Sequence, residues 1–388
     1  MPDTTPTMHW RPSPALSRNC NLSRYINWLA LKKGLRFEQY HDLWKWSTES
    51  VEAFWESLWE YFEVMAYTPY DQVLTGRQMP DYKWFNGATL NYAEHIFRQK
   101  SDDRPAILFQ NERQGLTEIS WDELTVQVAA LAAYMKKCGI QPGDRVAAFL
   151  PNTPHAMVAV LATMSLGAVW SSCSPDFGAG SVADRFVQIQ PKMLFTVDGY
   201  GYGGKSFDKK SVVTEIIGLL PSLEQVVMIP YLDENARLDE GFHVHYWSEV
   251  LAQYATNEPI TFTPVPFSHP IWVLYSSGTT GVPKAITHSH GGNLLEHLKY
   301  LHLHNDVRAG ERFFWFSTTG WMMWNFTLAA LLAGSTIVLY DGSPGYPNLD
   351  VLWQLAETAK ITHFGTSAPF LVSCMKAGLN PGAQYNLS

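Results

Sequence analysis

A stretch near the middle of the chain combines the residue types that bind phosphate. The sequence YSSGTTGVPK, Tyr275 to Lys284, continues an apolar run, Ile271–Tyr275, that predicts a strand. Glycines let the backbone turn its N–H groups inward, hydroxyl groups add donors, and a lysine adds positive charge, so the stretch predicts a polyphosphate site. The residues assigned to this site are Ser276, Ser277, Gly278, Thr279, Thr280, Gly281 and Lys284. The alternative, a polar hairpin turn, needs only one or two special residues.

The residues after this stretch distinguish it from a Walker loop. The sequence AITH after Lys284 is strand-like, and HGG follows, with Asn293 available to cap a helix over Leu294–Leu303. A Walker loop would enter its helix at once. We therefore expect a different phosphate-binding geometry here.

A second glycine-rich stretch competes with the first. GYGYGGKS, Gly199 to Ser206, fits both the Walker pattern and the dinucleotide pattern, with Glu224 at the spacing of a ribose-binding carboxylate. The two patterns imply different ligands, so the double match shows how permissive such patterns are. The next apolar run, QVVMIP, ends in Pro instead of the Asp that holds Mg²⁺ in Walker NTPases. A Walker-type NTPase at Gly199–Ser206 stays the alternative function, and a surface glycine loop is the third possibility.

Composition excludes several classes of protein. The 388 residues are 46% hydrophobic and include 15 Trp, which predicts a folded chain with a large core. The net charge is −8 without a run of Lys or Arg, so we expect no nucleic-acid partner. No segment has the unbroken apolar length of a membrane span, and the N-terminus has no signal-peptide pattern. Four scattered cysteines without a C-x-x-C pair fit a reducing, cytoplasmic location.

Two regions differ in their hydrophobic pattern. Residues 1–104 are rich in Trp and helical in pattern, with apolar residues every three or four positions from Val51 to Phe62, and we expect this extension to pack on the remainder. Over 105–388, strand-like and helix-like segments alternate, which predicts an α/β fold of layered mixed or parallel sheets with flanking helices. The segment Tyr231–Pro270 is more polar and is expected to be a surface excursion. Strands are predicted at Ala106–Phe109, Arg145–Leu150, Lys192–Val197, Gln225–Ile229, Ile271–Tyr275, Arg312–Phe316, Thr336–Tyr340 and Ile361–Phe364, and helices at Trp121–Lys137 and after Thr153.

YSSGTTGVPK resembles the phosphate loop of the AMP-forming acyl-CoA synthetases, which belong to the adenylate-forming superfamily. The resemblance covers essentially the whole chain, and WFNGATLNYAEHIF (Trp84–Phe97) looks like the N-terminal signature of the acetyl-CoA synthetase branch. Within that branch, DRFVQIQPKMLFTVDGYGYGGK, PFSHPIWVLYSSGTTG, TTGWMMWNF and LYDGSP look most like the members that activate acetoacetate. The fold implied is the large N-terminal domain of these enzymes.

The resemblance also implies a reaction. Acetoacetate and ATP would form acetoacetyl-AMP and diphosphate, and CoA would then displace AMP to give acetoacetyl-CoA. The stretch Ser276–Gly281 and Lys284 would bind the phosphates, with Lys284 and Thr280 as the catalytic residues and the Thr280 hydroxyl helping to hold Mg²⁺. Trp321, Met322 and Met323 would line the acyl pocket, unless they are ordinary core residues.

Two further groups of residues bear on CoA and on metal binding. Lys205, with Lys209 and Lys210 nearby, falls where the family receives the 3′-phosphate of CoA, although a solvated loop would look the same. The spacing of the histidines does not predict a metal site, because no H-E-x-x-H pattern or nearby Cys occurs. These histidines are His288, His290, His297, His302 and His304.

Synthetases of this family are longer than this chain. By the resemblance, the residues that complete the nucleotide site and the small C-terminal domain lie outside the 388 residues. We therefore expect the chain by itself to be inactive, as a nucleotide-binding domain without turnover.

Overall fold

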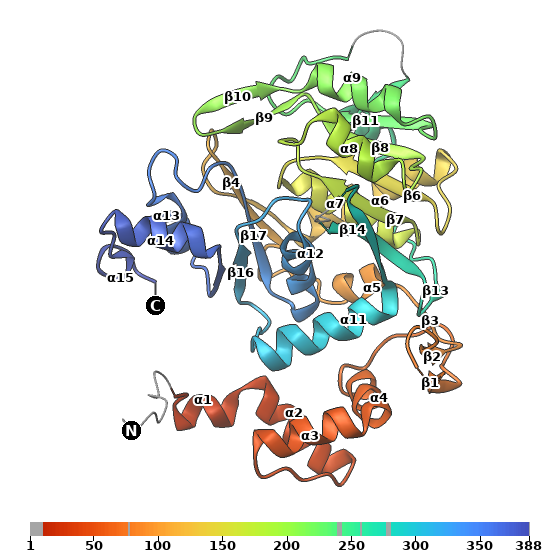
Figure 1. The fold of residues 1–388 in the computed structure, drawn as a ribbon, viewed down its shortest axis with the longest axis vertical. Helices are drawn as coiled ribbons and strands as arrows, with labels where there is room; N and C mark the ends of the chain where they lie inside the picture. The colour runs from red at the N-terminus through yellow and green to blue at the C-terminus, as the bar shows by residue number, and fades with distance from the viewer. Residues whose placement is uncertain (1–10, 77, 239–242, 257, 277–280, 388) are drawn as a thin grey trace.

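The computed structural model describes residues 11–76, 78–238, 243–256, 258–276 and 281–387, and it contains two large sheets with helices on both faces (Figure 1). The larger sheet has the strand order β12-β11-β8-β6-β7-β14-β15, in which only the β14–β15 pair is antiparallel. Its strands are β6 (Arg145–Phe149), β7 (Val169–Cys173), β8 (Met193–Val197), β11 (Gln225–Ile229), β12 (Val244–Tyr246), β14 (Pro270–Ser276) and β15 (Lys284–Ser289). The predicted α/β class with largely parallel sheets is confirmed.

The second sheet has the order β18-β16-β17-β4-β5 and is parallel except for the β4–β5 pair. Its strands are β4 (Ile107–Asn111), β5 (Thr117–Ile119), β16 (Arg312–Trp315), β17 (Thr336–Asp341) and β18 (His363–Gly365). Crossover helices cover both faces of a parallel sheet, which explains why the predicted strands read as continuous apolar runs.

Helices that share one apolar core with both sheets lie in the middle of the molecule. In α7, every residue except His155 is buried, as expected of a helix enclosed on all sides. These helices are α5 (Tyr92–Phe97), α6 (Trp121–Lys137), α7 (Pro154–Ser165), α11 (His290–Lys299) with its π-helical end η1 (Tyr300–His304), and α12 (Met322–Ala329) with the 3₁₀ turn η2 (Ala330–Ala333).

The outer faces of the sheets are covered by separate helices (Figure 1). Helices α8 and α9 pack on the far side of the larger sheet, and α13 and α14 pack on the far side of the smaller one. Their bounds are α8 (Ala179–Phe186), α9 (Lys210–Leu219), α13 (Val351–Thr358) and α14 (Ala368–Lys376), followed by the short α15 (Pro381–Gln384).

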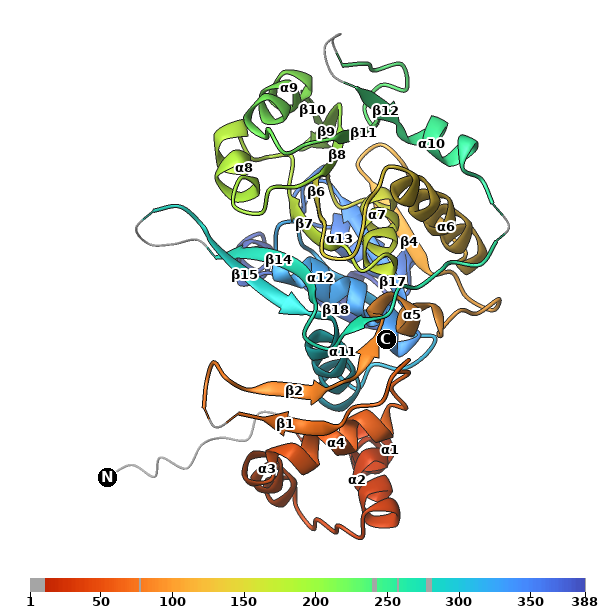
Figure 2. The same ribbon diagram turned by 90° about the vertical axis from the view of Figure 1, so that its right-hand side faces the viewer.

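The N-terminal region forms a layer of helices below the sheets (Figure 2). The predicted helix is present as α4 (Val51–Tyr61), but the hairpin that follows was not expected from the sequence. The remaining elements are α1 (Pro14–Asn19), α2 (Asn21–Lys32), α3 (Tyr40–Glu49), β1 (Gln72–Thr75), β2 (Lys83–Asn86) and β3 (Thr89–Leu90), which pairs with β13 (Val265–Pro266). The Asn21 side chain donates to the Val307 carbonyl oxygen at 3.0 Å, which links this layer to the segment after η1.

Two expectations for individual segments were wrong. The segment 231–270 is not a surface excursion, because β12 joins the larger sheet and α10 (Trp247–Gln253) buries Trp247 and Val250 in the main core. The helix expected from Leu294 begins at His290 instead, because Ser289 caps it by accepting a hydrogen bond from the Gly292 N–H. Among the described residues, no helix is long and apolar enough to cross a membrane.

Candidate active site

The predicted phosphate stretch lies at the open end of the β14–β15 hairpin. Ser276 and Lys284 face each other as partners in the ladder, so the two ends of the stretch are held together. Gly281 has φ +153°, a conformation that favours glycine, and Lys284 is exposed. The assigned residues Ser277, Gly278, Thr279 and Thr280 lie outside the described residues.

A cleft of about 340 Å³ opens where parallel strands of both sheets end. The strands end at a common edge, so the residues that follow them gather there even when they are distant in sequence. The cleft is lined by Pro151 and Asn152 after β6, Ser174, Pro175 and Asp176 after β7, Phe316, Ser317 and Thr318 after β16, Tyr340, Asp341 and Gly342 at β17, and Tyr200 and Tyr202.

Hydrogen bonds join the two sheets at this edge. The Asn152 side chain donates to the Tyr340 carbonyl oxygen at 3.2 Å and accepts from the Trp324 indole N–H at 3.0 Å. The Thr319 hydroxyl donates to the Leu150 carbonyl oxygen at 2.7 Å. Each buried polar group finds its partner on another element, which fixes the walls of the cleft relative to each other.

One carboxyl group in the cleft has a strongly shifted pKa. Burial raises the pKa of Asp341 to about 7, although the Tyr231 hydroxyl donates a hydrogen bond to it at 2.8 Å. The side chain of Asn111 in turn donates to the Tyr231 oxygen at 3.0 Å. Asp341 can therefore hold a proton near neutral pH, which is unusual for a carboxyl group.

The rival glycine-rich stretch does not form a phosphate loop. Gly199–Tyr202 and Lys205–Asp208 form an antiparallel hairpin, β9 and β10, and a protein carboxylate occupies the N–H groups at its tip. Glu112 accepts hydrogen bonds from Gly203 N–H at 2.7 Å and Gly204 N–H at 2.8 Å. An anion already fills the position that a phosphate would need, so the Walker and dinucleotide interpretations are unsupported.

The residues assigned to CoA lie on this hairpin and just beyond it. Lys205 begins β10 and is exposed, and it is not among the residues that line the cleft. Lys209 places its ammonium 5.6 Å from the ring centre of Tyr200, and Lys210 pairs with Asp208 at 3.1 Å. The hairpin borders the cleft through Tyr200 and Tyr202, and the role of Lys205 stays a prediction.

A second cavity, of about 490 Å³, lies between β15, α11 and α12. Met322 and Met323 line it, as the acyl-pocket prediction requires, whereas Trp321 precedes α12, is 66% exposed and does not line it. The two methionines are the first residues of α12. The other lining residues are His288, Asn293, Glu296, His297, Tyr300, Asn305, Trp315 and Phe326.

The histidines do not form a metal centre in the described part of the chain, where no group of three or more metal-binding side chains occurs. Burial instead lowers the pKa of all five, and that of His297 falls to about 3, so these rings are neutral at pH 7. His288 and His297 line the second cavity, and His290 does not.

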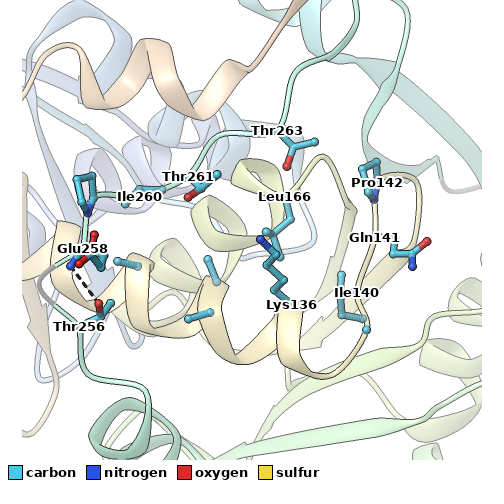
Figure 3. Close-up of a pocket in the computed structure, with 15 residues that line it drawn as sticks. Lys136, Ile140, Gln141, Pro142, Leu166, Thr256, Glu258, Ile260, Thr261 and Thr263 are labelled. Carbon is cyan, nitrogen blue, oxygen red and sulfur yellow. Dashed lines mark hydrogen bonds between the residues drawn. The ribbon is translucent and has the colours of Figure 1, made fainter.

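A third cavity, of about 530 Å³, lies on the outer side of α6 (Figure 3). Lys136, Ile140 and Leu166 form one wall. Residues that follow α10 form the other wall, namely Thr256, Glu258, Pro259, Ile260, Thr261 and Thr263. The hydrogen bond drawn between its lining residues joins two positions of the same segment, from the Glu258 N–H to the Thr256 hydroxyl oxygen at 3.0 Å. None of the described residues that line this cavity belongs to β14 or β15, and we assign no chemistry to it.

Comparison with known proteins identifies the family. The model of the AMP-binding enzymes matches residues 94–388, and that of the acetyl-coenzyme A synthetase N-terminus matches residues 40–96. The chain belongs to the AMP-binding enzyme family. Similar curated proteins are the acetoacetyl-CoA synthetases of Gallus gallus, 40% identical over 97% of this chain, and of Rhizobium meliloti (strain 1021), 39% identical over 98%.

A solved structure is similar throughout the described fold. The acetoacetyl-CoA synthetase from Streptomyces lividans matches with a TM-score of 0.94 and 47% identity, over 98% of this chain and 58% of that one. This AMP-binding enzyme chain spans 57% of the length of the Gallus gallus protein and 58% of that from Rhizobium meliloti.

Sequence analysis missed most of the residues that line the two cavities of this AMP-binding enzyme. Asn152 and Asp341 each follow a predicted strand, and the rule that ligands bind beyond the carboxyl ends of parallel strands could have found them. Asp176 follows β7, a strand that the sequence analysis did not predict. For Asn293 no such signal exists, because its position inside α11 depends on where that helix begins.

Proposed function

We propose that the full-length protein containing this chain is an ATP-dependent acetoacetate–CoA ligase that works through an acyl-adenylate. The observation that carries the proposal is the agreement of two facts. Curated acetoacetyl-CoA synthetases are 38–40% identical to this chain over 97% of it. The hairpin that holds the predicted phosphate stretch lies next to a cavity lined by both predicted acyl-pocket methionines.

In the first step, a carboxylate oxygen of acetoacetate bonds to the α-phosphorus of ATP, and the bond to diphosphate breaks. Negative charge grows on the departing phosphates. Ser276 and Lys284, paired across the ladder, would hold the phosphate stretch in place, and the Lys284 ammonium would stabilise that charge.

In the second step, the CoA thiolate attacks the acyl carbonyl carbon, and AMP leaves with the electron pair of the broken C–O bond. The chain supplies binding and orientation, which can account for much of such a rate enhancement. The cleft at the strand ends, with Tyr200 and Tyr202 on one wall, is the region we assign to the nucleotide and to CoA.

Mg²⁺ would be held mainly by the phosphate oxygens of ATP, with the Thr280 hydroxyl as the protein ligand. The described residues contain no cluster of metal-binding side chains that could hold the ion alone, and Mg²⁺ usually binds enzymes in this shared way. When bound, the ion neutralises phosphate charge.

We also propose that the chain divides at residue 104 into an N-terminal extension and an AMP-binding domain. We propose further that the protein acts on small molecules and is cytoplasmic. Support for the division comes from the change of pattern there and from the family models, which change over at residues 94–96. All four cysteines are free thiols, which fits a reducing compartment. The net charge of −8 disfavours a nucleic-acid partner.

The test is acid-dependent exchange of labelled pyrophosphate into ATP by the full-length protein, followed by acetoacetyl-CoA formation when CoA is added. Acetoacetate should support both reactions. ATP binding without exchange for any short acid would favour a nucleotide-binding protein without turnover, and it would refute the proposed function.

A further inference from the structure

The second cavity contains hydrogen-bond donors that the protein itself does not use. Its apolar walls are Trp315, Met322, Met323 and Phe326, and a cavity of about 490 Å³ is larger than a four-carbon acid. Size by itself would admit longer acids, so selection among short acids calls for polar contacts in the cavity. Two histidines of its lining, from β15 and α11, supply them.

His288 presents a defined donor. The Trp272 indole N–H donates to its Nδ1 at 2.8 Å, and an indole nitrogen can only donate. Nδ1 is therefore the unprotonated nitrogen, and the hydrogen of the neutral ring is on Nε2. Among the described residues, nothing pairs with His288 Nε2.

His297 is the second donor. It is only 2% exposed, its Nδ1 lies 2.7 Å from the Tyr92 hydroxyl, and its Nε2 is buried without a partner in the described part of the structure. The Tyr92 hydroxyl has no other described acceptor, so both groups are best satisfied when it donates to Nδ1. The ring hydrogen of His297 is then on Nε2, which is left unpaired.

The chemistry of the lining selects the type of group bound. Neutral N–H donors suit a neutral carbonyl oxygen, whereas a carboxylate prefers a cation. No Lys or Arg lines the cavity, and its one carboxylate, Glu296, already pairs with Lys299 at 3.0 Å. The nearest cation along β15 is Lys284, at the phosphate end of the same strand. An oxo acid would thus bind with its carboxylate toward Lys284 and its keto group toward the histidines.

We propose that His288 and His297 donate hydrogen bonds from Nε2 to the keto oxygen of a short 3-oxo acid, and so select it over the corresponding unsubstituted acid. This assignment rests on the proposed function and extends it to the origin of acid specificity. A ligand must displace the atoms that now cover His297 Nε2, and the lining includes Met323, whose unbranched side chain is flexible.

The test compares kcat/KM for acetoacetate and butyrate, which differ by the keto group, in the full-length enzyme. The variants are His288→Phe and His297→Phe, which keep an aromatic ring and remove the donor. Each should lower kcat/KM for acetoacetate about 10- to 100-fold, the effect of losing one buried hydrogen bond, and should change the value for butyrate less than about threefold. His288→Gln, which keeps both an acceptor and a donor, should restore part of the preference.

His290→Phe is the matched control. His290 lies on α11, as His297 does, is fully buried and also has an Nε2 without a partner in the described part of the structure. It does not line the cavity, so its replacement should leave the ratio of kcat/KM for acetoacetate to that for butyrate unchanged. Parallel losses for both acids in both histidine variants would overturn the assignment without affecting the proposed function. Equal kcat/KM for butyrate and acetoacetate in the wild-type enzyme would also overturn it, and this measurement does not depend on whether a variant folds. A wild-type enzyme that activates neither acid would instead refute the proposed function.

Discussion

Glu112 joins three chain segments that meet at the cleft, and its replacement is the most direct test of how the β9–β10 hairpin is held. Its Oε1 accepts from the Gly203 N–H and the Ser343 N–H, both at 2.7 Å, and its Oε2 accepts from the Gly204 N–H at 2.8 Å. Two glycine N–H groups in succession, both with positive φ, form the concave anion site that the carboxylate fills. The substitution Glu112→Gln keeps the shape of the side chain and removes its charge.

The cost of this substitution can be worked out bond by bond. The amide oxygen of Gln can keep the two bonds at the Oε1 position, now without charge, which loses about 0.5 kcal/mol each. The amide NH₂ then faces the Gly204 N–H, so the hydrogen bond is lost and two donors oppose each other. A hydrogen bond to a charged group contributes about 1.5–3 kcal/mol, and this is the cost of losing it. Because Gly204 is exposed, water can relieve part of this cost. We expect the free energy of unfolding to fall by about 2 kcal/mol in total.

Urea unfolding of Glu112→Gln and wild type measures this difference, and amide hydrogen exchange at Gly203 and Gly204 locates it. Exchange at both glycines should become faster in the variant, while the central strands are unaffected. The matched control is Glu118→Gln, an exposed carboxylate on β5 for which no hydrogen bond is found in the described part of the chain. A change in unfolding free energy no larger than that of the control, with unaltered exchange at the glycines, would refute the reasoning.

Three further predictions concern the candidate site. In the full-length enzyme, Lys284→Ala should lower acetoacetate-dependent pyrophosphate exchange ~100–1000-fold. Lys205→Ala should leave exchange intact and raise the KM for CoA. Loss of exchange in Lys205→Ala but not in Lys284→Ala would favour the Walker interpretation. Met323→Gly, and separately Met322→Gly, should raise kcat/KM for six- and eight-carbon acids relative to acetoacetate, at up to about 0.8 kcal/mol per enclosed methylene; an unchanged acid profile with lowered thermal stability would assign these residues to core packing. Because the pKa of Asp341 is raised from 3.8 to about 7, the folded state binds more protons than the unfolded state between these pH values, so this group makes stability fall as pH rises. In Asp341→Asn that fall should be reduced in urea unfolding from about pH 4 to about pH 8, and an identical pH dependence in both proteins would contradict the assignment.

Local sequence patterns predicted the sheets well. The apolar runs at 145–150, 192–197, 225–229 and 336–340 correspond closely to β6, β8, β11 and β17. Each of these strands is covered on both faces, so nearly every side chain is buried and the run is continuously apolar. Such a pattern depends only on local burial and can be read without knowing which strands are neighbours.

Other elements were decided by partners that are distant in the sequence. The segment around β12 and α10 looked polar, yet Trp247 is buried there because α10 packs against α6. The start of α11 depended on whether Ser289 or Asn293 acts as the cap, and both residue types are good caps. Pairing of β15 with β14 extends the strand to Ser289, which makes that residue the cap.

The sequence by itself predicts the phosphate-binding role of the stretch Tyr275–Lys284, because glycine, hydroxyl and lysine side chains within ten residues need no distant partner to show their chemistry. The tertiary structure alone decided the competition between the two glycine-rich stretches, because the carboxylate that fills the second one comes from Glu112, about ninety residues earlier. It also decided which histidines face the second cavity. Their unused N–H groups are defined by Trp272 and Tyr92, and only the packing of β14 and α5 against β15 and α11 places those partners within hydrogen-bonding distance.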